Sequence, residues 1–480
     1  MKKSIITILA LLALVALSTA AMAAVSAPTK EGLFEFTLGG YVKMDAIWDS
    51  TQININGVGP VLRNNDPNFH QGRLKFSANG TRFNFNFKGP KLWGAQVTGL
   101  IEAGFDAGGG TNPVPTAAPP AAAPADTNTF GNFRLRHAMF RLNWPETELI
   151  IGHYWGFFSS FTPETANDAG LQMVGAPSQR LPQIRLTQKF LGAYTAAILI
   201  GAQFDNSDFT TGGVVPVGVQ ALGTGGASTE TPQIQGMLAF EQDLWGKAAF
   251  YGVPRGFVAQ LAAGWQRNRF RPFVLGATNT WGNGTYVGTL VTQASNQYLD
   301  PWMVQGSLFI PVIATSSANL AGTASLTTQW QVGQGLTAFT EGPAGDFSFF
   351  EYMNPATFGA NRRLQKRFSG FVQGQYYFTN QWFLNVAWGM SRAYNVEQDP
   401  LLLATQGPVN LRTAANDPTK WMNQIIGTLW YRPITSLKFG LQYQYCRTKF
   451  FQQNGVVVGL PEAVDAGENH RVMFAGFFYF

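Results

Sequence analysis

The chain ends in HRVMFAGFFYF, residues 470–480, and this stretch decides the fold. Successive side chains of a β-strand point to opposite faces, so the residues divide into two sets. One set is apolar throughout: Val472, Phe474, Gly476, Phe478 and the terminal Phe480. The other begins with Arg471 and ends with Tyr479. A soluble protein rarely exposes such an apolar face, so the strand is predicted to face lipid or, alternatively, to lie buried in a β-sandwich.

The first 23 residues have the pattern of a secretory signal peptide. Two lysines precede an apolar run at residues 5–17, and Ala21-Met22-Ala23 forms a small-x-small cleavage site. The apolar run is shorter than the roughly 18 residues that a membrane-spanning helix needs, and no later stretch reaches that length. The chain is therefore predicted to be exported, with its mature part beginning at Ala24.

The composition favours a membrane barrel over a soluble class. Aromatic residues make up 14% of the chain and charged residues 12%, and the charged share is about half of the usual value for a globular protein. An apolar outer band with aromatic girdles around a polar interior accounts for both. The formal charge of +6 falls to +4 once the two lysines of the signal peptide are removed. The single cysteine, Cys446, cannot form an intramolecular disulfide.

Alternation of apolar and polar residues predicts 16 strands in one domain, residues 24–480. In the first, Phe34 to Asp49, one parity carries Phe36, Leu38, Val42, Met44 and Trp48, and the other carries Glu35, Thr37, Tyr41, Lys43, Asp45 and Asp49. The others are predicted at 71–89, 95–106, 132–144, 148–158, 182–191, 193–205, 232–241, 256–270, 301–311, 325–339, 368–378, 382–394, 421–431, 436–450 and 470–480. Together they predict an all-β fold, a 16-stranded antiparallel transmembrane barrel.

The predicted connections alternate in length. Short ones, such as 145–147, 379–381 and 433–435, take turns with long polar ones at 50–70, 107–131, 159–181, 206–231, 271–300, 340–367, 395–420 and 451–469. Outer-membrane barrels have this asymmetry, with short periplasmic turns and long extracellular loops. The connections at 242–255 and 312–324 are longer than the pattern requires, so counts of 14 or 18 strands stay open.

The second predicted strand changes its apolar parity near Asn79-Gly80. Leu74 and Phe76 lie on the opposite parity from Phe85 and its neighbours. Asn-Gly is also a strong signal for a two-residue hairpin. We expect a bulge, because a hairpin would leave residues 71–78 too short to span a membrane.

No residue pattern predicts a metal, another cofactor or a nucleic-acid partner. The four histidines, His70, His137, His153 and His470, lack metal-ligand spacing, and one cysteine excludes a Cys-based zinc site or a c-type haem. No nucleophile elbow or phosphate-loop signature is present. A serine beside a histidine base on the barrel wall stays open as the basis of a barrel enzyme, such as a phospholipase.

Basic residues recur on the parity that is predicted to face the lumen. They are Lys43, Arg73, Lys75, Arg82, Lys88, Arg141, Arg185, Lys189, Lys438 and Arg471. Such residues can simply hydrate the lumen, but a cluster on the early strands would also attract anions and repel cations. Replacing both Lys75 and Arg82 with Glu is then expected to reverse the ion preference.

The last strand resembles the C-terminal strand of Gram-negative outer-membrane barrels. In that class the final aromatic residues, here Phe474, Phe478 and Phe480, belong to the signal read by the barrel-insertion machinery. The whole mature chain resembles the 16-stranded trimeric porins in strand count, loop alternation and terminal Phe. The segment from Ser159 to Leu181 holds the position of the porin loop that folds into the lumen and narrows the channel.

The resemblance to porins also implies partners and site residues. In porins an acidic constriction loop faces a basic ladder, so Glu164 and Asp168 are expected to face Lys43, Arg73, Lys75, Arg82 and Arg141. Two patches, GGYVKMDAIWDS at 39–50 and FRLRHAMFRL at 133–142, resemble DcaP-type porins, which take up small carboxylates. The segment between Ala24 and the first strand leaves no room for the N-terminal helical extension of that type. A homotrimer embedded in outer-membrane lipid is implied as well.

The sequence therefore predicts an outer-membrane porin, without enzymatic activity, for passive diffusion of small anionic or neutral solutes and with a mild anion preference. The alternatives are a substrate-specific channel for small carboxylates or other anions, a barrel enzyme, and a structural barrel. Saturable conductance, lipid hydrolysis and a closed conductance, respectively, would identify them.

Overall fold

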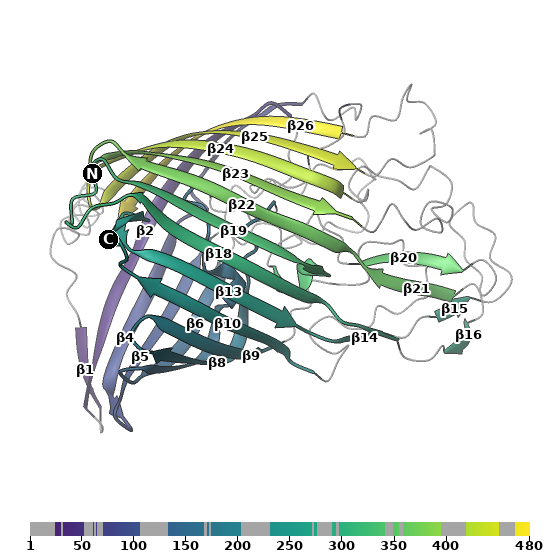
Figure 1. Ribbon diagram of the computed structural model, residues 1–480, viewed down its shortest axis with the longest axis horizontal. Helices are drawn as coiled ribbons and strands as arrows, with labels where there is room; N and C mark the ends of the chain where they lie inside the picture. The colour runs from purple at the N-terminus through teal and green to yellow at the C-terminus, as the bar shows by residue number, and fades with distance from the viewer. Residues whose placement is uncertain are drawn as a thin grey trace, which may run out of the picture.

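A computed structural model describes most of the chain between Val25 and Phe480 (Figure 1). The described residues are 25–29, 32–51, 61, 64, 71–105, 133–167, 170–171, 174–202, 231–270, 273–275, 290–293, 297–340, 349–354, 359–394, 419–450 and 466–480. The predicted signal peptide, residues 1–23, lies outside them. Among the described residues, no helix combines the length and the hydropathy needed to cross a bilayer.

Sixteen antiparallel strands form a closed barrel, which confirms the predicted fold class. They are β2 (Gly32–Asp49), the two-part strand β3 (Arg73–Ser77) and β4 (Arg82–Leu92), β5 (Ala95–Gly104), β6 (Arg134–Asn143), β7 (Thr147–Trp155), β8 (Arg180–Phe190), β9 (Tyr194–Gly201), β10 (Gln233–Gln242), β13 (Phe257–Trp265), β18 (Trp302–Ile313), β19 (Ala324–Gln334), β22 (Lys366–Tyr377), β23 (Trp382–Ala393), β24 (Thr419–Ile434), β25 (Leu437–Phe450) and β26 (Ala466–Tyr479). Each predicted range overlaps one of these strands, and the alternative counts of 14 and 18 are wrong.

The barrel closes where its first and last strands meet. β26 pairs with β2 in a register that places Phe478 opposite Val42 and Val472 opposite Trp48. Closure satisfies the backbone of every barrel strand and leaves no edge for lipid to meet. A short strand, β1 (Val25–Thr29), pairs with the beginning of β2, beyond the point that β26 reaches. The strands follow one another around the barrel in chain order (Figure 1).

β3 and β4 are two parts of one barrel strand, separated by a bulge. Both pair antiparallel with β2, with Ser77 opposite Asp45 and Arg82 opposite Tyr41. Between these pairs the β3–β4 segment advances one residue more than β2, and the extra residue switches the parity. The predicted bulge at Asn79-Gly80 is confirmed, and the hairpin is wrong.

The distribution of side chains is the inverse of that in a soluble protein. On β2 the apolar side chains of Leu38, Val42, Met44 and Trp48 are exposed on one face, while Lys43, Asp45 and Asp49 are buried on the other. The same inversion continues around the barrel, where the buried face carries Gln235, Gln260, Gln305, Gln329, Gln331, Gln373, Gln375, Gln424, Gln442 and Gln444. An apolar outer surface around a polar interior suits a barrel surrounded by lipid.

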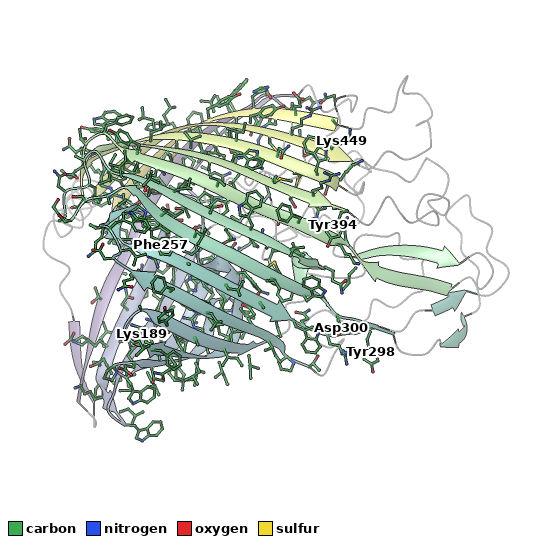
Figure 2. All side chains as sticks on the ribbon, in the orientation of Figure 1. Lys189, Phe257, Tyr298, Asp300, Tyr394 and Lys449 are labelled. Carbon is green, nitrogen blue, oxygen red and sulfur yellow. The ribbon has the colours of Figure 1, made fainter. Side chains whose placement is uncertain are left out.

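Aromatic side chains gather on the outer surface near the end of the barrel that has the short turns. The rings of Tyr194 and Phe240 lie 5.1 Å apart, and those of Trp245 and Phe257 lie 5.7 Å apart. Phe257 and Lys189 are labelled near this end in Figure 2, whereas Tyr298, Asp300, Tyr394 and Lys449 lie toward the end with the long connections. Aromatic girdles of this kind mark the interface between lipid and water.

Additional short strands are not part of the barrel wall, and none was predicted as a separate strand. The long turn between β10 and β13 contains a hairpin of β11 (Ala248–Phe250) and β12 (Val253–Arg255). Beyond the other end lie a pair, β14 (Asn268–Phe270) and β17 (Gln297–Leu299), and a four-stranded sheet of β15 (Phe273–Leu275), β16 (Leu290–Gln293), β20 (Phe349–Asn354) and β21 (Gly359–Leu364) (Figure 1). The short length of these strands explains why alternation did not reveal them.

Candidate functional site

The connection between β7 and β8 contacts the inward face of the barrel, and we call it the inner loop; the structure describes its residues 156–167, 170, 171 and 174–179. It begins with a short 3-10 helix, η2 (Phe157–Ser159). Amide side chains of the wall hold its first part. The Phe157 N–H donates to Gln235 Oε1 at 2.9 Å, and Gln260 Nε2 donates to Ser160 Oγ at 2.8 Å. Irregular backbone in a barrel needs such partners, because each N–H and C=O removed from water must be paired.

The rest of the inner loop is held by strands farther along the chain. The N–H of Glu164 donates to Gln373 Oε1 at 2.7 Å, and the N–H of Ala166 donates to Gln442 Oε1, also at 2.7 Å. Lys43 Nζ donates to the Ala166 carbonyl at 2.8 Å. These partners lie on β22, β25 and β2. With the contacts to β10 and β13, they place the loop along the inner wall from β10 round to β2.

Apolar side chains of the inner loop are buried inside the barrel. The ring of Phe158 meets that of Phe339 edge to face at 5.4 Å, where Phe339 belongs to η3 (Leu336–Phe339). Phe161 and Leu171 are buried in a second cluster, together with Phe309 of β18. Full burial of one such side chain stabilises by about 1.5–3 kcal/mol. The loop is therefore held by apolar packing as well as by the wall amides.

Glu164 is the buried acidic residue of the inner loop. Its carboxylate forms an ion pair with Lys438 of β25 and accepts a hydrogen bond from Gln375 Nε2 at 2.8 Å. Burial alone would raise the pKa of this carboxyl, but the charge and hydrogen bond of Lys438 outweigh burial and hold the pKa below its ordinary value. Glu164 is therefore ionised at neutral pH.

Glu164 pairs with a cation on a late strand, since Lys438 lies on β25. Of the early basic residues, Lys43 binds the same loop through the Ala166 carbonyl. A buried carboxylate needs a cation within hydrogen-bonding reach, and Lys438 is that cation here. Asp168, the other acidic residue expected in this loop, lies outside the described residues.

Several predicted basic residues have acidic partners on the same wall. Lys43 Nζ lies 3.1 Å from Asp45 Oδ2. Asp49 is shared by Arg73 at 2.9 Å and Arg471 at 2.8 Å, and the side chains of Asp49 and Arg471 are fully buried. Acidic side chains therefore compensate part of the basic charge in this part of the barrel. Asp45 and Asp49 share the lumen parity with Lys43, and this signal was visible in the sequence.

A second group of predicted residues lies on β6 to β8. Arg141 Nε lies 3.2 Å from one oxygen of Glu148, and Arg185 Nη2 lies 3.5 Å from the other. Both guanidinium groups lie over the Tyr154 ring, at 5.7 and 5.3 Å from its centre. Here one carboxylate serves two arginines. The guanidinium of Arg185 also lies over the ring of Phe157, 5.6 Å from its centre, so this side chain reaches the inner loop.

Two more of the predicted basic residues, Lys75 and Arg82, lie on the two parts of the second strand. Lys75 is half-buried and pairs in register with Ile47 of β2. The guanidinium of Arg82 lies over the ring of Tyr41, 5.7 Å from its centre. Both are on the inward parity, on opposite sides of the bulge.

The two sides of the interior differ in exposure. On the side that carries the inner loop, Gln373 is 5% exposed and Gln442 is 0% exposed. On the side of β6 to β8, the side chains of Arg141 and Glu148 are 26% and 27% exposed. Solvent therefore reaches the wall of β6 to β8, while the inner loop covers the wall of β22 to β25.

Two groups of lumen residues were not predicted. Arg136 Nε pairs with Glu102 Oε1 at 2.9 Å, at a register shift between β5 and β6. The inward position of Glu102 can be predicted from its parity in the sequence. Arg136 points inward because of the register shift, and alternation does not reveal such a shift. The other group is the glutamines that bind the inner loop, because alternation shows only that they face inward.

Histidine and cysteine chemistry has little support in the structure. Within the described ranges, no group of three His, Cys, Asp or Glu residues is arranged to hold a metal ion. His470 Nδ1 lies 2.8 Å from the Tyr443 hydroxyl on the exposed face. Cys446 is buried, and Gln424 Nε2 donates to its sulfur at 3.6 Å. His70 lies outside the described residues.

The barrel is similar to solved outer-membrane channels. The outer membrane channel DcaP of Acinetobacter baumannii matches with a TM-score of 0.60 at 15% identity, covering 95% of this chain and 99% of that chain. OprB of Pseudomonas putida matches with a TM-score of 0.50 at 10% identity, covering 92% of this chain and 94% of that chain. No protein-family model and no curated protein matches the sequence. At these identities the likeness concerns the fold alone: the chain has the barrel fold of outer-membrane porins, as its strand pattern predicts.

Proposed function

We propose that the protein is an outer-membrane porin through which small hydrophilic solutes diffuse passively. The observation that carries the proposal is the inverted distribution of side chains, with exposed apolar residues outside and polar residues inside the closed barrel. Such a barrel is suited to surround water within lipid. The proposal includes export by the signal peptide at residues 1–23, residence in the bacterial outer membrane, and transport without any chemical reaction or cofactor.

The mild anion preference is proposed from the solvent-exposed wall. Arg141 and Arg185 share the single carboxylate of Glu148 there, so this group carries an excess of one positive charge. A charge in a narrow passage with low-dielectric walls acts on permeating ions more strongly than the same charge in bulk water. Arg73 and Arg471 share Asp49 in a similar way, but the side chains of Asp49 and Arg471 are fully buried. The Glu164–Lys438 pair contributes less, because both of its side chains are buried.

A substrate-specific channel for small carboxylates is the second candidate. It is favoured by the two guanidinium groups at Glu148, since a carboxylate solute can replace Glu148 as their partner. Such a site would make conductance saturate with the anion, whereas simple diffusion would give a current proportional to concentration.

The assembly of the barrel completes the proposal. Phe474 and Phe478 are exposed on the outer face of β26, where lipid and the insertion machinery would meet them. Phe480 joins the first strand, since its N–H donates to the Gly40 carbonyl at 3.1 Å and its carbonyl accepts from the Gly40 N–H at 3.1 Å. We include these three residues as the insertion signal and a homotrimer as the assembled form.

Recording in planar lipid bilayers tests the channel function. The purified protein should first show different migration with and without boiling on a denaturing gel, because a closed barrel resists detergent. Protein in that folded form is expected to give discrete, ohmic conductance steps. A folded barrel that gives no steps would contradict the porin and favour a structural barrel.

A further inference from the structure

The hairpin of β11 and β12 lies against the inward face of the barrel. It arises from the turn between β10 and β13, at the end opposite the inner loop. Ser325 Oγ of β19 donates to the Ala249 carbonyl at 2.9 Å, and the ring of Phe250 meets that of Phe309 on β18 at 5.2 Å. Ala248 and Ala249 are fully buried. A periplasmic turn thus enters the barrel from one end while the inner loop enters from the other.

The tip of this hairpin contacts the inner loop. The hydroxyl of Tyr251 donates to the Thr162 carbonyl, and the rings of Phe250 and Phe161 meet edge to face at 5.8 Å. Arg255 extends the contact, because its guanidinium lies 4.6 Å from the centre of the Phe250 ring and 5.7 Å from that of Phe161. The two inward elements are therefore in direct contact.

Arg255 is itself fixed from the barrel wall. Its Nε and Nη2 donate to the two carboxylate oxygens of Glu241 on β10, at 3.0 and 2.9 Å. A bidentate pair of this kind sets the orientation of the guanidinium as well as its position. The hairpin tip and the inner loop are thus positioned by one anchored side chain.

The turn at the tip has a close match elsewhere in the chain. Tyr251-Gly252 and Trp93-Gly94 are both two-residue turns with positive φ at both positions: 51° and 79° in the first, 52° and 80° in the second. This is the type I′ hairpin geometry, for which Asn-Gly is the preferred sequence. The turn type therefore explains the positive φ of Tyr251, and the contacts of its side chain are not needed to explain it.

The surroundings of the two turns differ. Trp93 is 79% exposed and nothing lies within 4 Å of a Cβ built on Gly94. A Cβ on Gly252 would lie 2.7 Å from Arg432 Nη1, so the second turn is confined by the wall at β24. The Tyr251 residue as a whole is nevertheless 40% exposed, so it borders solvent beside the inner loop.

We propose that the hairpin at 248–255 and the inner loop form the constriction together, and that Tyr251 determines its width and holds the inner loop in place. The proposal rests on the proposed function, since it requires a conducting barrel. The solutes concerned are small and hydrophilic, and the hairpin limits their size from the periplasmic side. The tyrosine acts in two ways: its ring occupies cross-section, and its hydroxyl restrains Thr162.

Substitutions that keep the turn separate these two effects. In Tyr251→Asn the turn is retained, because Asn suits a positive φ, while the ring is removed. Single-channel conductance at high salt is expected to rise about 1.5-fold, since current is limited by the narrowest segment. Larger neutral sugars should also enter liposomes that contain the variant. In Tyr251→Phe, conductance should stay near that of the wild type, but the open current should become noisier because Thr162 loses its partner.

Two further variants keep the proposal testable. Trp93→Asn makes the same type of change at the matched turn outside the barrel and should leave conductance unchanged. Tyr251→Trp introduces a residue that this turn type already accommodates at Trp93, and it should lower the conductance. If folded Tyr251→Asn and Tyr251→Trp both conduct like the wild type, the proposal is overturned and the porin function stands. If wild-type barrels do not conduct at all, the porin function itself fails.

Discussion

Glu164 and Lys438 form an ion pair inside the barrel although 274 residues separate them in the chain. One belongs to the inner loop and the other to β25, near the closure of the barrel. Gln375 and the Asn385 side chain bind the same residue, at 2.8 Å to its carboxylate and 2.9 Å to its carbonyl. The position of the inner loop therefore depends on strands that are synthesised last.

We expect the ion pair to hold the inner loop in place. Lys438→Met would leave the Glu164 carboxylate buried without its cation, a change that typically costs about 3–5 kcal/mol. The inner loop should then leave the wall, and single-channel currents should become noisier. Adding Glu164→Gln should restore much of the quiet current, because the uncompensated charge is gone. Lys189→Met, at an exposed lysine near the end of β8, is the control. Equal noise in the single and double variants would show that the pair does not hold the loop.

The same pair predicts a dependence on acid. The pKa of Glu164 is held below its ordinary value of 4.5, despite burial, by Lys438. A carboxyl with a lowered pKa stabilises the folded arrangement above its unfolded pKa and loses this contribution as pH falls through the folded value. Channel current should therefore stay quiet at neutral and mildly acidic pH, and become noisy only at a pH below the ordinary glutamate pKa of 4.5. Glu164→Gln should show no such onset, and an identical acid onset in both proteins would exclude Glu164 as its cause.

Strand positions could be predicted because they depend on a short-range property. Lipid outside and water inside impose opposite polarity on alternate residues, so Phe34 to Asp49 already shows both faces of the wall. The bulge near Asn79-Gly80 was predictable for the same reason, since it shifts this parity. Cys446 shares the parity of Gln442 and Gln444, and all three are buried.

The contacts within the lumen could not be predicted from alternation. Parity shows that Gln373 and Gln442 point inward, but not that they bind the backbone of Glu164 and Ala166. These contacts depend on the path of an irregular loop across the barrel. The hairpin tip at Tyr251 was missed for a similar reason, because two three-residue strands are too short for a period to be recognised.

Deletion of Phe480 is expected to reduce barrel assembly. The residue makes two backbone hydrogen bonds with Gly40, both at 3.1 Å, at the seam between the last strand and the first. The fraction of protein that migrates differently with and without boiling should fall, while Phe480→Tyr, which keeps the aromatic ring and the backbone bonds, should assemble normally. Normal assembly of the deletion would remove this residue from the insertion signal.

The homotrimer is expected to use the outer surface near the barrel seam. Leu74 and Phe76 of β3 are 67% and 56% exposed beside β2. Replacing both with Asn should give monomers in native mass spectrometry of gently extracted protein, without loss of the folded barrel. Leu238→Asn, at an exposed position on β10, is the control. Wild-type protein that is monomeric throughout would contradict the trimer, and trimeric Leu74→Asn/Phe76→Asn would place the interface elsewhere.

Ion preference is expected to depend on the arginines of the exposed wall more than on the buried ones. Replacing Arg141 and Arg185 with Gln leaves Glu148 without cations, so the zero-current potential in a salt gradient should shift toward cation preference. Arg471→Gln is the control, because its side chain is fully buried and Asp49 keeps Arg73.

The anion preference of the wild type should decrease between 0.1 and 1 M salt, as the screening length falls from about 10 Å to about 3 Å.

Lys75→Glu with Arg82→Glu tests the neighbouring part of the wall and should also shift the zero-current potential toward cation preference, because both residues lie on the inward parity. A cation-selective wild type would contradict the proposed preference. If Arg471→Gln shifts the potential as much as Arg141→Gln with Arg185→Gln does, then the passage does not follow the wall of β6 to β8, since a fully buried charge should act on permeating ions least.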